Sequence, residues 1–224
     1  MQLAALGAVS ACAPTKTPTQ DDTGPRGDSP GGDSPHDSDT GTPWDEQRCE
    51  SGEVFVPEEC VTYPPAGEGP YYRDGIPERN ELNVWEEEGV PLVVLLRITE
   101  HCVPIEGAKV ELWHAGQAGL YDTESADYNG FGYQTTDLDG SVCFRTIRPP
   151  SYPGNPQDPE SELVQQHIHI KVWVLGELRM NSQLQFADDP IEPPQSEGLR
   201  HELTDLGSGT YRLAQLIELN PPPA

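Results

Sequence analysis

The chain has 224 residues, enough for one domain of ordinary size and a tail, and its hydrophobic content of 34% is low for a chain folded throughout. Its formal net charge is −25, from 38 acidic and 13 basic residues, which argues against nucleic acid or anionic lipid headgroups as partners. No apolar run reaches about 18 residues, so the sequence predicts no membrane-spanning helix.

The first segment, residues 1–12, is small and apolar and ends in Val9-Ser10-Ala11-Cys12. It resembles the lipobox of bacterial lipoproteins. The resemblance implies that Cys12 is the lipidated first residue of an exported protein, either anchored to a membrane or extracellular. The apolar run is short and no Lys or Arg precedes it, so an ordinary disordered start with a chance cysteine is the alternative.

Residues 13–47 are dense in Pro, Gly, Ser, Thr and Asp and contain one large apolar residue, Trp44. Such a segment cannot bury enough apolar surface to fold. We expect a disordered low-complexity linker that tethers a domain, although a plain disordered tail has the same composition. The folded domain is expected to occupy residues 48–224.

The cysteine content fits an exported protein. Apart from Cys12 it consists of an even set, Cys49, Cys60, Cys102 and Cys143. The expected disulfides join Cys49 to Cys60 and Cys102 to Cys143, although four cysteines permit three pairings. No CxxC spacing indicates a zinc site.

From residue 91 onward, short apolar runs alternate with turn signals such as Asp137-Leu138-Asp139-Gly140, which predicts an all-β domain. Turn residues at this density favour a sandwich or a barrel. The only helix predicted is a short one around residues 196–206. The predicted strands are 91–98, 108–115, 141–147, 167–175, 179–186 and 210–219.

Two tyrosines lie in loops between these strands. Tyr121 follows the strand that ends near Trp113, where Glu111 and Trp113 are expected on the face opposite Val110. Tyr152 lies in the sequence PPSYPG, where the prolines restrict φ and fix the direction of the ring. Each tyrosine alone is more often structural, with its hydroxyl bonded to the backbone.

The stretch HIHIKVWV, residues 167–174, alternates strictly. Its apolar residues, from Ile168 to Val174, form one row, and His167 and His169 point together to the other face. Two imidazoles on one face can share one metal ion. For an isolated His-x-His pair, a partly exposed strand without a metal is the more frequent explanation.

Tyr121 and Tyr152, taken together with His167 and His169, favour a metal site over a strand without a metal. A phenol has an ordinary pKa near about 10 and needs a highly charged cation to become phenolate at neutral pH. Thiolate sites suit zinc or copper(I) and carboxylate sites suit calcium or magnesium, whereas a mixed phenolate and imidazole set favours ferric iron.

Several stretches together resemble the intradiol ring-cleavage dioxygenases, the catechol and protocatechuate 3,4-dioxygenase group, over roughly residues 64–190. The resemblance implies an antiparallel β-sandwich with long active-site loops, and the lipobox, linker and extra cysteines are similar to its secreted members. The stretches, in chain order, are GEGPYY (67–72), ERNEL (78–82), PIEGAKVELWHAGQAGLY (104–121), TDLDGSVCFRTIRPPSYPG (136–154), HIH (167–169) and SQLQF (182–186).

The resemblance also implies a non-haem Fe(III) cofactor, a small aromatic diol and O2 as substrates, and a cis,cis-muconate-type product. The implied iron ligands are Tyr121, Tyr152, His167 and His169. Tyr152 would leave the metal when substrate binds, and Gln183 corresponds to a glutamine near the iron. Tyr71 and Tyr72 fall where the family lines its substrate cleft.

The chain departs from the family at Val164, where relatives commonly carry an arginine three residues before the first histidine. Arg145 or Arg148 would replace it only if the loops bring them in. Two hypotheses follow: a tethered intradiol dioxygenase, or a catalytically impaired surface module of the same fold that binds phenolic ligands. No oligomeric state is predicted.

Overall fold

The computed structural model describes residues 60–194 and 197–221. The chain divides into two units, Met1–Asp39 and Thr40–Ala224, and every described residue lies in the second. The lipobox-like segment with Cys12, the linker 13–47 and Cys49 lie outside the described residues, so what was expected of them stays a prediction.

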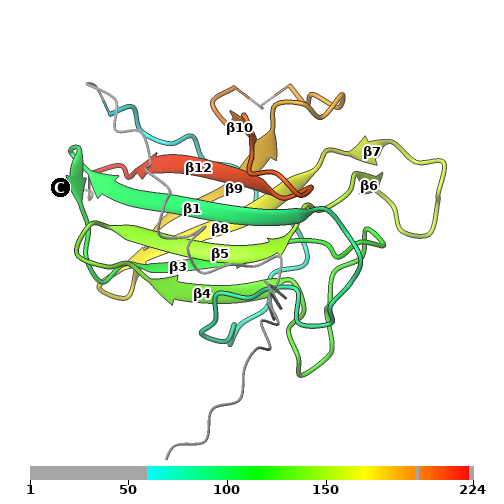
Figure 1. Ribbon diagram of the computed structural model, residues 1–224, viewed down its shortest axis with the longest axis horizontal. Coiled ribbons are helices and arrows are strands. Elements are labelled where there is room, and N and C mark those ends of the chain that lie inside the picture. The colour runs from blue at the N-terminus through cyan, green and yellow to red at the C-terminus, as the bar shows by residue number, and fades with distance from the viewer. Residues whose placement is uncertain (1–59, 195–196, 222–224) are drawn as a thin grey trace, which may run out of the picture. The chain divides into compact units, whose positions relative to one another are not determined.

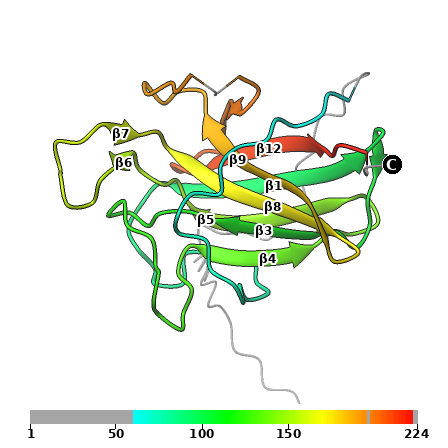
Figure 2. The same cartoon turned by 180° about the vertical axis from the view of Figure 1, so that it is seen from behind.

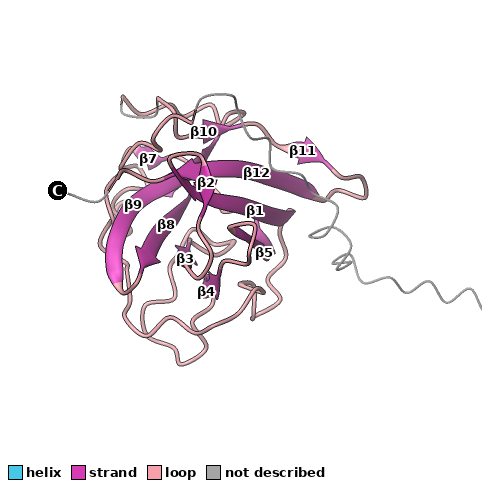
Figure 3. Cartoon of the chain, turned by 90° about the vertical axis from the view of Figure 1, so that its left-hand side faces the viewer, coloured by secondary structure: helices cyan, strands magenta, loops and turns pink. Residues whose placement is uncertain are grey.

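The described residues form twelve strands and no helix (Figure 3). The all-β prediction is therefore confirmed. The longer strands are β1 (Pro91–Glu100), β3 (Lys109–Trp113), β4 (Phe131–Thr135), β5 (Ser141–Ile147), β8 (His167–Val174), β9 (Glu177–Phe186) and β12 (Tyr211–Glu218). The two-residue strands are β2 (Val103–Pro104), β6 (Tyr152–Pro153), β7 (Leu163–Val164), β10 (Arg200–His201) and β11 (Thr204–Asp205).

The predicted short helix is wrong over residues 197–206. There β10 pairs with β9 and β11 pairs with β12, so sheet edges take the backbone hydrogen bonds that a helix would use internally. Within the described residues there is thus no helix with the length and apolarity needed to cross a membrane.

Two five-stranded sheets build the sandwich. In one, β1 lies between β12 and β5 and also pairs with β2; in the other the order is β10-β9-β8-β3-β4. Figures 1 and 2 show the first sheet in front of the second from one side and behind it from the other. Side chains from both sheets form one apolar core, which includes Leu92, Val94, Leu96, Val110, Leu112, Phe144, Ile168, Ile170, Val172 and Leu184.

Most strand pairs are antiparallel, as expected of the sandwich, but each five-stranded sheet also contains one parallel pair. β1 and β12 pair in parallel from Leu92 opposite Tyr211 to Thr99 opposite Glu218, and β9 pairs in parallel with β10. Parallel neighbours need a long connection, and all ten other strands lie between β1 and β12 in the chain.

The disulfide pairing also differs from the expectation. Cys60 is bonded to Cys102, with their Cα atoms 5.5 Å apart, so the expected pairs Cys49–Cys60 and Cys102–Cys143 are wrong. The cause is topological: the chain after Cys60 runs along β12, where the Tyr63 amide donates to the Glu218 carbonyl, while the Glu218 carboxylate accepts from the Cys102 amide. Cys143 is also disulfide-bonded.

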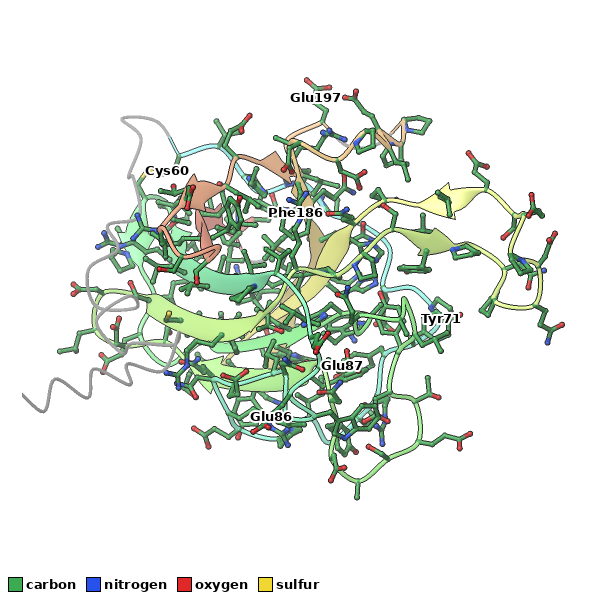
Figure 4. All side chains as sticks on the ribbon, turned by 45° about the vertical axis from the view of Figure 1, so that its right-hand side comes forward. Cys60, Tyr71, Glu86, Glu87, Phe186 and Glu197 are labelled. Carbon is green, nitrogen blue, oxygen red and sulfur yellow. A yellow bond between two sulfur atoms is a disulfide. The ribbon has the colours of Figure 1, made fainter. Side chains whose placement is uncertain are left out.

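The ribbon of β6 and β7 and the long loop from residue 114 to 130 extend from the same end of the sandwich (Figures 1 and 2). Tyr71 lies at that end, whereas Cys60 lies towards the other (Figure 4). Strand β8 begins at the loop end, so its first residues are placed under these loops.

Candidate metal centre

Strand β8 presents two histidines on the face that points away from the apolar core. Ile168 and Ile170 are fully buried between the sheets, which confirms the predicted apolar row. His167 and His169 are each only 3% exposed, because neighbouring strands and loops cover the outer face as well. Trp113 on β3 is paired with His169 and its ring stacks on the imidazole, with centroids 4.7 Å apart and planes at 5°. The pair is therefore a buried feature and not the polar face of an exposed strand.

The two imidazoles meet through their Nε2 atoms, which lie 3.0 Å apart. The Nδ1 atom of His167 is 2.8 Å from the Gln165 carbonyl, and since a carbonyl only accepts, this Nδ1 carries the proton. In the neutral ring, the lone pair of His167 Nε2 then points at the cluster. His169 Nδ1 has no hydrogen-bond partner among the described residues.

Two tyrosine hydroxyls complete the cluster. Tyr121, from the loop after β3, places its Oη 3.3 Å from His167 Nε2. Tyr152, on β6, places its Oη 3.3 Å from that of Tyr121. Oxygen and nitrogen donors about 2.1 Å from a shared ion and at roughly right angles lie about 3 Å from each other. The three contacts that link the four atoms in a row therefore have the spacing that a shared ion requires.

Glycines allow two loops to approach these side chains closely. Gly69 has a φ of +70°, and a Cβ there would lie 3.2 Å from Cε1 of His169. Gly119 has a φ of +73°, and a Cβ there would lie 2.7 Å from the Cβ of Tyr152. A larger residue at either position would be strained and would push the loop away from the cluster.

The loop that carries Tyr121 is fixed by the next residue, Asp122. Its carboxylate accepts hydrogen bonds from the backbone amides of Ser125 at 2.9 Å and Asn129 at 2.8 Å. Burial raises the pKa of Asp122, but the hydrogen bond from the Ser125 hydroxyl together with these amides outweighs burial, and the pKa is lowered. Arg73 donates to the carbonyls of Asp122 and Ser125, both at 2.9 Å, and so joins this loop to the segment that carries Tyr71.

Burial sets the protonation of all four candidate ligands. It lowers the pKa of His167 and His169, so both rings are neutral at neutral pH, the form that binds metals. It raises the pKa of Tyr121 and Tyr152, so both phenols stay protonated unless a cation compensates the charge. Two phenols, two neutral imidazoles and no thiolate form a donor set that fits ferric iron.

One other group of donor atoms is close together in the described part of the chain. Atoms of Cys60, Cys102 and Glu218 lie within 4.8 Å of one another. The two sulfurs are bonded to each other and are not thiolates, so this group offers a single carboxylate and no metal site.

The structure separates the two tyrosines that were expected in the substrate cleft. Tyr71 stacks on Tyr121, with centroids 4.6 Å apart and planes at 19°. Tyr72 turns away: its hydroxyl donates to Glu111 at 3.1 Å, and Lys171 Nζ lies 3.2 Å from its ring centroid. Tyr71 therefore contacts the cluster, while Tyr72 lies further along the outer face of the sheet.

Gln183 lies on β9 directly opposite His169. Its Nε2 donates to the Gly67 carbonyl at 3.3 Å, and the register puts its side chain on the face of the sheet that carries the imidazoles. Its role near the iron stays a prediction.

Val164, the departure from the family pattern, lies on β7 opposite Tyr152. Arg148 is bound to Asp188 at 2.6 and 2.9 Å and to Gln166 at 2.6 Å, so its charge is already paired. Arg145 lies on β5, in the other sheet, and pairs with Glu81 at 3.8 Å. Both arginines are thus already paired with carboxylates.

Sequence reasoning missed several groups that shape the cluster. Trp113 had a signal, because the alternation of its strand already placed it on the outer face. The Gln165 carbonyl and the Arg73 guanidinium had none, since their contacts join segments that are distant in sequence or involve only the backbone.

The comparisons with known proteins identify the family and the fold. The family described as dioxygenase matches residues 67–197, more than half of the chain. Catechol 1,2-dioxygenase 1 from Acinetobacter lwoffii is 30% identical over 145 residues, which is 55% of this chain and 46% of that protein. This chain belongs to the intradiol ring-cleavage dioxygenase family. It spans about half or less of the length of the curated relatives it matches.

Solved structures of intradiol dioxygenases have the same fold. The dioxygenase domain of a dioxygenase carbohydrate-binding protein fusion from Streptomyces sp. SirexAA-E aligns with a TM-score of 0.60 and 28% identity, over 71% of this chain and 99% of that one. Catechol 1,2-dioxygenase from Acinetobacter radioresistens aligns with a TM-score of 0.62 and 23% identity, over 72% of this chain and 63% of that one. The second likeness concerns the fold alone.

Proposed function

We propose that this chain is an intradiol dioxygenase that inserts both atoms of O2 into a catechol-type ring at a non-haem Fe(III) centre. The observation that carries the proposal is the convergence of Tyr121 Oη, Tyr152 Oη, His167 Nε2 and His169 Nε2, in a member of this family. Catechol and one O2 together contain all the atoms of the cis,cis-muconate-type diacid, so the reaction consumes no external reductant.

Tyr121, Tyr152, His167 and His169 would hold the ferric ion, which when bound supplies the Lewis acidity and electron-accepting capacity that catechol activation needs. The protein orients this donor set in advance. The Gln165 carbonyl fixes the tautomer of His167, and the Trp113 ring fixes the plane of His169.

The two tyrosines have different surroundings, which supports different roles. Tyr121 is held on two sides, by the Tyr71 ring and by the Asp122 turn, and would remain a ligand throughout. Tyr152 belongs to a two-residue strand in a projecting ribbon, and its Oη would take a proton from a catechol hydroxyl as substrate binds. Loss of that proton prepares the substrate as an anion.

The alternative, a surface module that binds phenolic ligands without turnover, has one support. Val164 removes a positive charge opposite Tyr152. All four donor side chains are nevertheless present and converge, which a module without iron chemistry has no need to keep together. We therefore favour the enzyme.

The visible spectrum of the purified, iron-loaded protein tests the proposal. Tyrosinate bound to ferric iron gives a red to burgundy charge-transfer band; anaerobic addition of catechol should shift this band, and oxygen should then bleach it. A colourless protein that still binds catechol would contradict the enzyme and support the binding module.

We also propose that the protein is exported and carries a lipid on Cys12, on the basis of the lipobox-like segment and the linker of residues 13–47. In a bacterial host, the full chain should then partition into detergent and incorporate labelled fatty acid. The variant Cys12→Ser should do neither. Equal labelling of both chains would contradict the anchor.

A further inference from the structure

The sheet of β1, β5 and β12 has a second face, which points away from the apolar core. Leu92, Val94 and Leu96 point into the core, so the residues that alternate with them on β1 point outward. The neighbouring strands add to this face the residues that pair with them. We call it the arginine face, and its residues include Val93, Leu95, Arg97, Cys143, Arg212 and Leu216.

The arginine face is covered. Val93, Leu95 and Leu216 are 2%, 5% and 7% exposed, yet Figure 1 looks onto this face and no described segment crosses the middle of β1 and β5 there. The stems of the arginines are not the outermost layer, because the Nε atoms of Arg97 and Arg212 are themselves buried. The cover therefore comes from a part of the chain outside the described residues.

Cys143 indicates which part of the chain this is. It lies opposite Leu95, in the middle of the arginine face, and it is disulfide-bonded. Cys60 and Cys102 are bonded to each other, so the cysteines that remain as its partner are Cys12 and Cys49. The bond of Cys143 thus joins the arginine face to the chain that precedes residue 60.

Chain length favours Cys49 over Cys12 as the partner. Cys60 is held at Cys102, which follows Leu95 by seven residues, a distance of at most about 23 Å at the rise of a strand. The 11 residues from Cys49 to Cys60 can span up to about 36 Å, so they reach with slack. Cys12 is 48 residues from Cys60, and closing the longer loop is about ninefold less favourable. Cys49 also belongs to the same compact unit as the sandwich, whereas Cys12 does not.

The segment between Cys49 and Cys60 has a composition that complements the arginine face. Its sequence, ESGEVFVPEE, contains four glutamates, no Lys or Arg, and one apolar run, residues 54–56. The arginine face presents three cations around its apolar side chains, namely Arg97, Arg145 and Arg212. Burial of the apolar run against those side chains is favourable, and the glutamates bring the negative charge that the arginines require.

We propose that Cys49 is bonded to Cys143 and that residues 50–59 pack on the arginine face, with the apolar run 54–56 against its apolar centre. The linker then joins the domain on the side of the sandwich opposite to the outer face of β8, which carries the candidate metal centre. The candidate metal centre therefore faces away from the point of attachment. This inference goes beyond the proposed function, and its tests involve neither iron nor catechol.

Peptide mapping of the unchanged full chain, purified from an oxidising compartment and kept non-reduced, tests the disulfide. A glutamyl endopeptidase cuts after Glu53 and Glu59 and so separates Cys49 from Cys60, which trypsin does not, because no Lys or Arg lies between them. Mass spectrometry should then find a Cys49–Cys143 peptide pair beside the Cys60–Cys102 pair. Cys143 linked to Cys12, Cys143 as a free thiol, or a disulfide-linked dimer on a non-reducing gel would overturn the proposal.

Substitution of Phe55 tests the packing separately from the disulfide. Phe55→Ala leaves all five cysteines in place and removes the largest apolar side chain of residues 50–59, so the melting temperature should fall by about 5 °C or more. Trp44→Ala, in the linker, is the matched control and should change the melting temperature by less than about 1 °C.

The two measurements together decide the inference. Equal melting temperatures of Phe55→Ala and the unchanged chain would refute the packing, even with the Cys49–Cys143 bond in place. A fall as large in Trp44→Ala would refute it too, because the linker would then be part of the folded domain. If Phe55→Ala does not fold, Phe55→Leu decides in its place, with an expected fall of about 2 °C or more.

Discussion

The two faces of β8 are both buried, but for different reasons. On the inner face, Ile168 and Ile170 are fully enclosed by apolar side chains of both sheets. On the outer face, His167 and His169 are 3% exposed and Lys171 is 4% exposed, under loops that bring polar and aromatic groups. Burial of an apolar side chain is favourable in itself, whereas burial of a polar one needs a partner.

The outer face meets this need in two ways. Lys171 finds a protein partner, because its Nζ lies 2.5 Å from the Glu68 carboxylate and over the Tyr72 ring. The imidazoles find each other and two phenols, an arrangement of lone pairs that a cation completes. The same strand therefore uses one face for stability and the other for a candidate metal site.

The largest expected effect comes from removing one candidate ligand atom from the metal centre on the outer face of β8. His169→Ala or Tyr121→Phe removes one of four donor atoms, and we expect the affinity for ferric iron to fall by about 100-fold or more. Iron content after dialysis against a weak chelator, together with the charge-transfer band, measures the effect. Full iron occupancy in both variants would contradict the ligand assignment.

The matched control lies one residue along the strand, on the inner face. Ile170→Ala should lower the free energy of unfolding by about 2–5 kcal/mol, since Ile170 is fully buried, and the folded protein should still bind iron. Urea unfolding and iron content should be measured on Ile170→Ala and His169→Ala. The first variant should lose mainly stability and the second mainly iron. Similar losses of stability and iron in the two variants would mean that the faces are not separable.

His114 is another buried imidazole, but both of its ring nitrogens have protein partners, so it needs no cation. It is 1% exposed; Nδ1 donates to the Ala115 carbonyl at 2.8 Å, and Nε2 accepts from Thr146 Oγ1 at 2.6 Å. Burial, opposed by the Ala115 carbonyl and aided by His167, lowers the pKa of His114 from 6.5 to about 4.

This shift predicts a dependence of stability on pH. Between pH 6.5 and about 4, the unfolded chain binds a proton at His114 that the folded chain does not. The contribution of His114 is therefore fully present above pH 6.5 and is lost as the pH falls towards 4, by up to about 3 kcal/mol. Urea unfolding at several pH values should give a flatter curve for His114→Gln than for the unchanged chain. Parallel curves would show that His114 titrates normally.

Much of the sandwich could be predicted from local pattern. Six predicted strands correspond to β1, β3, β5, β8, β9 and β12, because alternation or a continuous apolar run identifies them without knowledge of their neighbours. β4 was missed because Gly132 interrupts it. That glycine is needed: a Cβ there would lie 2.5 Å from a Leu82 methyl group, a contact that no local pattern reveals.

Pairing between distant segments could not be predicted in the same way. The parallel register of β1 with β12 and the Cys60–Cys102 bond depend on which segments meet in space, and several pairings are compatible with one sequence. For the metal centre, alternation placed His167 and His169 on one face, but Tyr121 and Tyr152 were assigned through the order of several motifs. The contact between Arg73 and the loop of Tyr121 had no signal in the sequence.

That contact carries the smallest expected effect, because Arg73 lies one layer outside the candidate ligands. Its guanidinium joins the segment of Tyr71 to the loop of Tyr121 and lies 3.8 Å from the centroid of the Tyr128 ring. Arg73→Met should loosen the stacking of Tyr71 on Tyr121, raise the dissociation constant for iron by about threefold to tenfold and shift the charge-transfer band.

Arg79→Met is the matched control, since Arg79 donates to the Asp127 carbonyl of the same loop at 2.9 Å but lies near its exposed side. Arg79→Met should lose a similar hydrogen bond but leave the charge-transfer band unchanged. If both variants shift the band equally, the loop as a whole and not the Arg73 junction positions Tyr121. If neither variant shifts the band, the candidate ligands on the outer face are positioned by their direct contacts alone, as the apolar side chains of the inner face are.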